Sequence, residues 1–162
     1  MRGSTCTLVA AGLLALAGIL HAPASACTRL VYLGANGEVI TARSMDWTED
    51  IATNLWAFPR GMRRSGQGGP GTPDWTSKYG SIVASGYDIS TTDGLNEAGL
   101  AAQLLWLVES EYPAPGRDRP GLAISLWAQY VLDHYATVAE AVEALRQEPF
   151  VVVTDHVPGQ DR

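Results

Sequence analysis

The chain has 162 residues, of which 46% are hydrophobic and 17% are charged, and its formal net charge at pH 7 is −6. This composition is typical of a globular domain and excludes a disordered chain, while the acidic balance argues against nucleic acid or an anionic membrane surface as a partner. The few cysteines and histidines are scattered along the chain, so the sequence predicts no metal site and no cofactor.

Residues 1–26 have the pattern of a secretory signal peptide. Arg2 supplies the positive start, residues 8–20 form an apolar run, and Ala24-Ser25-Ala26 is a small-x-small cleavage pattern. Cleavage after Ala26 would leave a mature chain, residues 27–162, and we expect it in the periplasm or outside the cell. No later apolar run is long enough to cross a bilayer, so we expect no membrane span.

Cys27 is the only cysteine of this expected mature chain, and an unpaired cysteine in an exported protein needs an explanation. It could be a small packed residue, or it could carry a lipid anchor, although that pathway usually prefers a larger aliphatic residue than Ala24 three positions earlier. The third interpretation is an N-terminal nucleophile whose own α-amine acts as the base. The amine titrates near ~7.7–8.0 and the thiol near ~8.5, both close to neutral pH. We retain the nucleophile as the main hypothesis and a non-catalytic, lipid-anchored envelope protein as the alternative.

The first part of the mature chain predicts a hairpin, because Asn36-Gly37 between two strand-like segments is the strongest short signal for a tight turn. A two-residue turn there places Arg43 across from Leu30, on the face of the hairpin opposite to Cys27. A one-residue bulge would move Arg43 to the face of Cys27.

The same turn places Asp46 across from Cys27. Arg43 and Asp46 are three residues apart, so their side chains would point to opposite faces of one regular strand. We therefore expect the chain to leave strand geometry between them, or the hairpin to carry a bulge. Arg43 could then favour the thiolate, and Asp46 could accept a hydrogen bond from the α-amine. Without the cysteine, the plain interpretation of these two residues is a surface ion pair.

The whole chain predicts an α+β protein with helices packed on antiparallel sheet, since strands come first, helices follow and a last strand ends the chain. Only eight residues follow that strand, and we expect the chain to be the front part of a longer protein.

The run at 100–108 is apolar enough for a central strand. Strands are predicted at 28–34, 39–43, 54–58, 79–85, 100–108 and 150–154, loops at 60–73 and 110–120, turns at 93–94 and 96–99, and helices at 121–135 and from the capping box at Thr137 and Glu140 to Pro149.

The tryptophans could line a pocket for an apolar or aromatic acyl group, although tryptophan is more often a core residue. Trp127 on the first helix is expected in the core. Trp47, next to Asp46, and Trp106, in the predicted central strand, are expected near a substrate. Attack on an amide carbonyl would also need oxyanion donors, each worth ~10²–10³ in rate, and composition does not place them.

Several segments carry a family resemblance when they are taken together: Cys27-Thr28-Arg29, Arg43-Ser44-Met45-Asp46-Trp47, Thr53-Asn54-Leu55-Trp56, and Tyr87-Asp88 through the run Asp93 to Leu100. With them the sequence resembles the choloylglycine hydrolase family of N-terminal nucleophile hydrolases, which includes penicillin V acylases and conjugated bile salt hydrolases. The resemblance covers essentially the whole mature stretch. It implies a four-layer αββα sandwich, of which this chain would be the N-terminal half, no metal, and hydrolysis of a linear, non-peptide amide.

The resemblance also implies roles for single residues. Cys27 matches the nucleophile, Arg43 the arginine beside it and Asp46 the aspartate that holds the amine. Trp106 falls where a backbone N–H of the family helps to form the oxyanion hole. Typical bile salt hydrolases have asparagine there and typical penicillin V acylases have tyrosine, so Trp106 departs from both. A second oxyanion donor and a further arginine of the family have no matching position before Arg162.

The sequence therefore predicts an exported enzyme whose partner is a small-molecule amide, and a homo-oligomer is compatible with it. Penicillin V, conjugated bile acids and N-acyl homoserine lactones all offer an apolar acyl part on an amide. The sequence does not select among them.

Overall fold

The computed structural model of the chain describes residues 27–47, 49–107, 109–113 and 119–154. The signal peptide predicted at residues 1–26 lies outside these ranges. The elements, in chain order, are β1 (Arg29–Leu33), β2 (Val39–Arg43), β3 (Leu55–Phe58), β4 (Arg63–Ser65), β5 (Asp74–Thr76), β6 (Ser81–Gly86), β7 (Ser90–Asn96), β8 (Ala101–Gln103), β9 (Gly121–Ala123), α2 (Ile124–His134), α3 (Val138–Leu145) and β10 (Val151–Val153).

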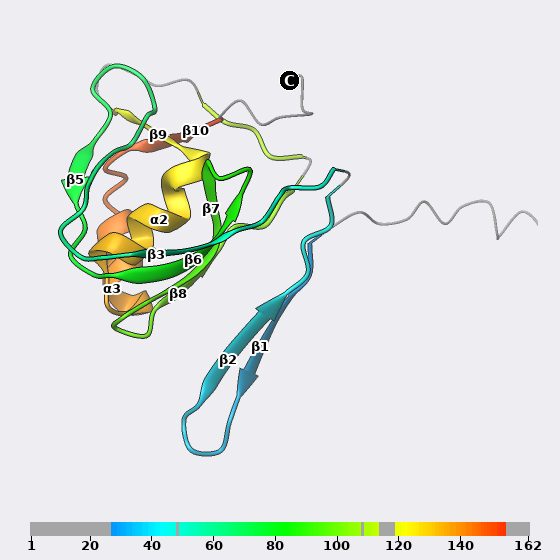
Figure 1. Cartoon of the computed structure of the whole chain (residues 1–162). Coiled ribbons are helices and arrows are strands. Elements are labelled where there is room, and N and C mark those ends of the chain that lie inside the picture. Colours follow the sequence, from blue (N-terminus) through cyan, green and yellow to red (C-terminus); the bar gives the residue numbers. More distant parts are fainter. Residues whose placement is uncertain (1–26, 48, 108, 114–118, 155–162) are drawn as a thin grey trace, which may run out of the picture.

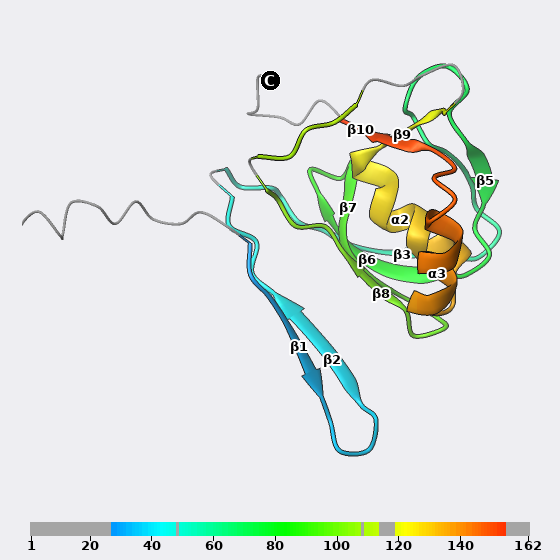
Figure 2. The ribbon, with the colours of Figure 1, turned by 180° about the vertical axis from the view of Figure 1, so that it is seen from behind.

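An antiparallel sheet with the strand order β3-β6-β7-β8 is packed against α2 (Figures 1 and 2). Val83, Gly94 and Ala102 are cross-strand neighbours in this sheet. Ala128 and Leu132 of α2 are fully buried and belong to the same hydrophobic core. Full burial of a leucine side chain contributes ~1.5–3 kcal/mol, so this contact fixes the helix on the sheet. The observed layering, helix on antiparallel sheet, is the one that the sequence predicts.

Asp93 and Gly94 lie inside β7, so the turn predicted there is wrong. A Cβ on Gly94 would lie 2.4 Å from Leu132 Cδ1 and 2.8 Å from Val83 Cγ1. Glycine stands at this position because the helix approaches the strand closely, and not because the chain reverses. The chain reverses at the second predicted turn, where Gly99 has a φ of 92°.

The central strand predicted at residues 100–108 is much shorter in the structure. β8 contains three residues and lies at one end of the described sheet. Ala102 is buried, whereas Trp106 and Leu107 are 36% and 60% exposed. The start of the apolar run packs in the core, and its continuation, which includes Trp106, borders a cavity. Val108 lies outside the described residues.

The helix predicted at 121–135 begins later, at Ile124, because its first three residues form β9. A short apolar run fits a strand as well as a buried helix, which is why periodicity missed this boundary. The backbone at Gly121 lies against Gly68, whose carbonyl oxygen would be 2.3 Å from a Cβ on Gly121. β9 pairs in parallel with β10, which gives the last predicted strand its partner. The loop predicted at 60–73 contains β4, which pairs with β5.

The capping box predicted for α3 is confirmed. Thr137 Oγ1 accepts a hydrogen bond from the Glu140 backbone N–H at 3.2 Å, and the Glu140 carboxylate accepts one from the Ala136 N–H at 2.9 Å. The first bond satisfies the Glu140 N–H, a donor that the first turn of a helix leaves unpaired, and the second fixes the residue just before the N-cap Thr137. The helix ends at Leu145, ahead of Pro149.

The β1–β2 hairpin extends away from the rest of the described chain (Figures 1 and 2). Arg43 lies across from Arg29, one residue away from the predicted pairing with Leu30. Because directly opposed residues share a face, Arg43 is on the face that Arg29 and Cys27 share by alternation. The predicted two-residue register is therefore wrong, and the alternative with a bulge describes the hairpin.

The turn chemistry explains this register. Three residues separate Gly34 and Glu38, whose backbones are joined by a hydrogen bond of 2.7 Å. Gly37 has a φ of 84° and Asn36 is not among the residues with positive φ, although a two-residue type I′ turn needs both. The Glu38 carboxylate accepts hydrogen bonds from the Asn36 N–H at 3.0 Å and from Asn36 Nδ2 at 3.1 Å, which holds the longer loop.

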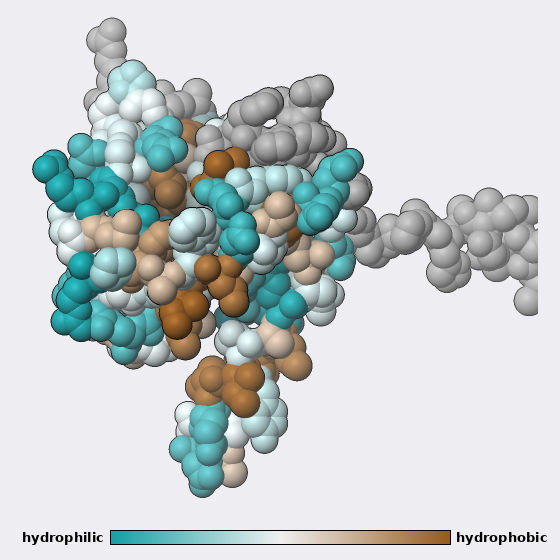
Figure 3. Space-filling view, viewed as in Figure 1, coloured by the Kyte–Doolittle hydropathy of each residue, from teal (hydrophilic) through white to brown (hydrophobic). Residues whose placement is uncertain are grey.

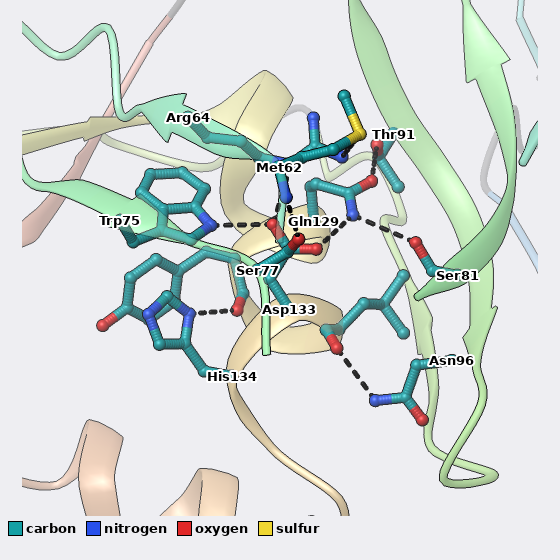
Figure 4. A network of polar contacts seen from close by, with 12 residues as sticks. Met62, Arg64, Trp75, Ser77, Ser81, Thr91, Asn96, Gln129, Asp133 and His134 are labelled. Carbon is teal, nitrogen blue, oxygen red and sulfur yellow. Dashed lines mark hydrogen bonds and ion pairs between the residues drawn. The ribbon is translucent and has the colours of Figure 1, made fainter. Parts of the chain in front are cut away.

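A buried polar cluster joins α2 to strands of the sheets (Figure 4). The Asp133 carboxylate is fully buried and accepts hydrogen bonds from Trp75 Nε1 at 2.7 Å and Gln129 Nε2 at 2.8 Å. Arg64 Nε lies 2.8 Å from Asp133 Oδ2. Gln129 Oε1 in turn accepts from Thr91 Oγ1 at 2.8 Å. Both oxygens of Asp133 and Oε1 of Gln129 have donors within the cluster, so we assign it to stability.

Replacing Asp133 with alanine is expected to lower the free energy of unfolding by ~3–5 kcal/mol, because it leaves the guanidinium of Arg64 buried without its anion. Urea unfolding of the full-length protein, followed by tryptophan fluorescence, measures the change. Glu143→Ala on α3 is the matched control: this side chain is 74% exposed, and its loss should change stability by no more than ~0.5 kcal/mol. Equal losses in the two variants would contradict the assignment.

Large hydrophobic side chains are exposed on the hairpin and on the sheet face opposite to α2. Figure 3 shows hydrophobic surface, in brown, on the projecting hairpin, where Leu30 is 62% and Leu33 72% exposed. On the sheet, Leu55, Ile82 and Leu95 are 78%, 63% and 53% exposed. An open sheet face of this kind is what one half of the predicted αββα sandwich presents. Within the described ranges, no helix is both long enough and apolar enough to cross a membrane.

Candidate active site

Cys27 borders a hydrophobic cavity at the base of the hairpin. The Thr28 N–H donates to Ser44 Oγ at 3.2 Å and the Ser44 N–H donates to the Thr28 carbonyl at 3.0 Å, which continues the hairpin beyond β1 and β2. The cavity encloses about 750 Å³ when the open space at its mouth is included. Its described lining is Cys27, Met45, Trp47, Ile51, Gly86, Tyr87, Ile89, Ser90, Thr92, Leu104, Leu105, Trp106, Tyr112, Ile124 and Ser125.

Two of the tryptophans expected near a substrate form one wall of this cavity. The rings of Trp47 and Trp106 are 5.2 Å apart and meet edge to face at 85°. Trp47 Nε1 donates a hydrogen bond to Tyr87 Oη at 3.0 Å. Sequence reasoning placed Trp47 and Trp106 near a substrate but gave Tyr87 no role. The only signal for Tyr87 was its place in a segment shared with a family.

Arg43 is buried behind the cavity, with a side chain that is 5% exposed. Its Nε lies 2.5 Å from Asp93 Oδ2, and its Nη2 donates to the carbonyl oxygens of Thr92 at 3.2 Å and Leu104 at 2.8 Å. The guanidinium therefore ties the hairpin to β7 and to the segment after β8. Asp93 was missed as a partner because the sequence suggested a turn at that position.

Asp46 lies beyond the end of β2, which is at Arg43, so the expected break in strand geometry between these two residues is present. The Asp46 side chain is exposed and makes no hydrogen bond or ion pair with another described residue. In this chain the nitrogen of Cys27 belongs to the amide that joins it to Ala26. The charged amine expected as the partner of Asp46 exists only after cleavage.

The backbone N–H of Trp106 donates no hydrogen bond to any residue that the structure describes. Pairing between β7 and the chain after β8 continues to Leu104, whose N–H donates to the Thr92 carbonyl at 2.8 Å. Trp106 lies two residues further on, at the cavity. An N–H in this position can donate to a ligand carbonyl or to an oxyanion.

The turn between β6 and β7 brings Tyr87 to the cavity through an uncommon backbone conformation. Tyr87 and Asp88 both have a φ of 54°, in the left-handed region that disfavours a non-glycine residue by ~1–2 kcal/mol. The Ile89 N–H donates to the Gly86 carbonyl at 3.1 Å and closes the turn.

The Asp88 carboxylate collects hydrogen bonds from three side chains. Trp56 Nε1 donates to Oδ1 at 2.9 Å, Ser85 Oγ donates to Oδ1 at 2.8 Å, and Asn54 Nδ2 lies 3.0 Å and 2.9 Å from the two oxygens. These bonds, chiefly the one from Trp56, hold the pKa of Asp88 below its usual value. The carboxylate therefore stays ionised throughout the neutral range.

Among the residues that the structure describes, no three His, Cys, Asp or Glu side chains are grouped so that they could hold a metal ion. The cavity is lined by the thiol of Cys27 and by Trp106, whose backbone N–H has no partner among the described residues, while the buried Arg43 guanidinium and the exposed Asp46 carboxylate lie outside its described lining. These are groups that can attack, polarise and stabilise an acyl group.

The chain matches the family model described as linear amide C–N hydrolases, choloylglycine hydrolase family, over residues 27–160. A penicillin V acylase from Pectobacterium atrosepticum is 56% identical over 146 residues, and the match covers 85% of this chain and 39% of the relative. The chain therefore spans about two fifths of the length of the curated relative that it matches.

Two solved structures resemble the chain. Penicillin V acylase from Agrobacterium tumefaciens superposes with a TM-score of 0.74 and 65% identity, covering 78% of this chain and 40% of that one. A mutant of conjugated bile acid hydrolase from Clostridium perfringens superposes with a TM-score of 0.65 and 21% identity, covering 83% and 42%, and shows the shared fold. These matches confirm the predicted fold class, with this chain as the N-terminal half. The chain belongs to the choloylglycine hydrolase family of linear amide C–N hydrolases.

Proposed function

We propose that the full-length protein is an exported amidase that uses Cys27 as its nucleophile to hydrolyse linear, non-peptide amides. The observation that carries this proposal is the position of Cys27 at a hydrophobic cavity whose wall contains Trp47 and Trp106. The family match supports the reaction class. The predicted signal peptide would direct the protein out of the cytoplasm, and its removal would free the α-amine of Cys27.

The reaction would proceed in two halves. The Cys27 thiolate adds to the amide carbonyl, the C–N bond breaks, and the leaving amine takes the proton that the α-amine had removed from the thiol. The acyl group is then a thioester on Cys27. The α-amine next removes a proton from water, which adds to the thioester carbonyl, and the acid leaves as the thiol is restored.

Neighbouring residues would assist each half. The guanidinium of Arg43 favours the thiolate, although its ion pair with Asp93 weakens that field while fixing the position of the guanidinium. Asp46 would accept a hydrogen bond from the freed amine and orient it. The N–H of Trp106, which has no partner among the described residues, would donate to the oxyanion.

The lining of the cavity favours an apolar acyl group. An aromatic acyl group could continue the edge-to-face contact between Trp47 and Trp106, a geometry worth ~0.5–1.5 kcal/mol beyond area burial. The proteins that resemble this chain are named penicillin V acylase and conjugated bile acid hydrolase. We therefore propose penicillin V, a conjugated bile acid or an N-acyl homoserine lactone as the substrate, with a preference for the aromatic acyl group of the first.

The second candidate is a lipid anchor on Cys27, which would make the protein a non-catalytic envelope component. The half-buried position of Cys27 at the cavity favours the nucleophile, because an anchoring thioether has to leave the protein surface freely. An anchor would also block the α-amine and add acyl mass.

Trapping the thioester distinguishes the two candidates. Full-length processed protein is mixed with phenoxyacetyl p-nitroanilide, quenched in acid and digested. The peptide that begins at Cys27 should carry the phenoxyacetyl mass, and treatment with iodoacetamide beforehand should abolish both the adduct and p-nitroaniline release. An N-terminal peptide that is already lipidated, or a free Cys27 that gains no acyl mass during turnover, would overturn the proposal.

A further inference from the structure

The β6–β7 turn contains one residue that does not face the cavity. Gly86, Tyr87, Ile89 and Ser90 all line it, whereas Asp88, in the middle of the same turn, does not. The Asp88 side chain is directed instead to the outer side of the turn, where it binds other parts of the chain.

The bonds of Asp88 oppose the strain of the turn. Two consecutive non-glycine residues with positive φ persist only where surrounding contacts hold them. Asp88 supplies those contacts through Asn54 and Trp56, from the segment next to the turn. The Tyr87 N–H also donates to the Ile51 carbonyl at 2.7 Å, so the same segment holds the turn at a second point.

The position of the turn determines the position of Trp47. Tyr87 Oη accepts the hydrogen bond of Trp47 Nε1 at 3.0 Å, and Trp47 in turn meets Trp106 edge to face. A path of direct contacts therefore runs from Asp88 through Tyr87 and Trp47 to the wall beside Cys27.

We propose that Asp88 is a positioning residue that sets the shape of the acyl pocket: it locks the strained turn so that Tyr87 holds Trp47 against Trp106. This inference rests on the proposed amidase function. Asp88 touches neither the thiol nor the reacting carbonyl, so its removal should weaken binding of a large acyl group and leave the chemical step unchanged.

The test is Asp88→Asn in the full-length processed protein. Asparagine tolerates positive φ as well as aspartate does and keeps an oxygen for Trp56 and Ser85, but its NH₂ group replaces Oδ2 opposite Asn54 Nδ2, which removes that hydrogen bond and the negative charge without disfavouring the turn. KM for phenoxyacetyl p-nitroanilide should rise about three- to tenfold, the factor of one lost hydrogen bond, with kcat nearly unchanged. KM for acetyl p-nitroanilide, whose acyl group is too small to reach the wall, should stay the same.

Glu97→Gln is the matched control, because Glu97 is also a hydrogen-bonded carboxylate in a turn of this sheet, but its turn contributes no residue to the described lining of the cavity. A double-mutant cycle with Tyr87→Phe tests the path: if Asp88 acts through Tyr87, the two effects on KM should be clearly less than additive. Additive effects, an equal rise of KM for both substrates, or a change no larger than that of Glu97→Gln would each overturn the proposal.

A readout without substrate separates this proposal from the proposed function. The edge-to-face pair of Trp47 and Trp106 should contribute to near-ultraviolet circular dichroism, and Asp88→Asn should reduce that signal without changing the far-ultraviolet spectrum. If the wild-type protein hydrolysed no amide but the signal fell, the reaction would be wrong and the positioning role would stand. If the wild-type protein were active and the signal and KM did not change, the positioning role would be wrong.

Discussion

Replacing Cys27 with serine is expected to lower kcat/KM for amide hydrolysis by at least about 1000-fold, because the weak α-amine base activates a hydroxyl far less well than a thiol. The substitution changes little volume at a half-buried site, so the fold should survive. Initial rates with phenoxyacetyl p-nitroanilide measure the loss, and far-ultraviolet circular dichroism and thermal unfolding check the fold. The full-length protein is needed because this chain spans about two fifths of its relative.

Thr28→Ser is the control for this substitution. It makes an equally small change one residue along, where the structural contacts are made by the backbone N–H and carbonyl rather than by the side chain. It should keep most of the activity. Near-normal turnover by the Cys27→Ser protein would show that Cys27 is not the nucleophile, whatever the outcome for Thr28.

Retaining Ala26 in front of Cys27 is expected to reduce activity by a similar factor, about 1000-fold or more. The nitrogen of Cys27 would then be an amide, which cannot accept the proton of the thiol at neutral pH. The additional residue would also sit where Asp46 is expected to meet a charged amine. Mass spectrometry of the N-terminus identifies the form that is present, and initial rates compare the two forms.

Removal of the added residue by an aminopeptidase provides the control, since activity should return with the free Cys27 terminus. If the extended protein were as active as the processed one, the α-amine would not be the base. The thiol would then need another proton acceptor near the cavity.

The fold could be predicted from the sequence where local chemistry decides the structure. Thr137 and Glu140 predicted the start of α3 because a capping box acts within one turn of helix. Gly94 was misread because the reason for glycine there is Leu132, a helix residue far along the chain. Asn36-Gly37 predicted a turn correctly but not its length, which depends on hydrogen bonds of the Glu38 side chain.

The candidate site divides in the same way. Cys27 could be identified because it directly follows the expected cleavage pattern, and Trp47 because it is next to Asp46. Both signals are local in the sequence. The pairing of Arg43 with Asp93 and Leu104 joins segments that lie up to 61 residues apart in sequence, and no periodicity contains that information. The contact of Tyr87 with Trp47 likewise depends on a turn in which Tyr87 and Asp88 have positive φ. Neither residue is a glycine, so the sequence did not indicate such a turn there.

The buried contacts of the Arg43 guanidinium have a consequence for how a ligand binds. Arg43 is the last residue of β2, and the chain continues from it to Trp47. Its guanidinium donates a hydrogen bond to the carbonyl of Leu104, two residues before Trp106. The two segments that carry Trp47 and Trp106 are therefore held at a set separation before any ligand arrives, and breaking that tie would leave an unpaired charge in a buried place. A ligand that fits does not have to order either segment, so less of its binding free energy is lost to conformational entropy. Lysine at position 43 would keep the charge but could not bond both segments with one planar group, so part of the cavity would have to become ordered when the ligand binds.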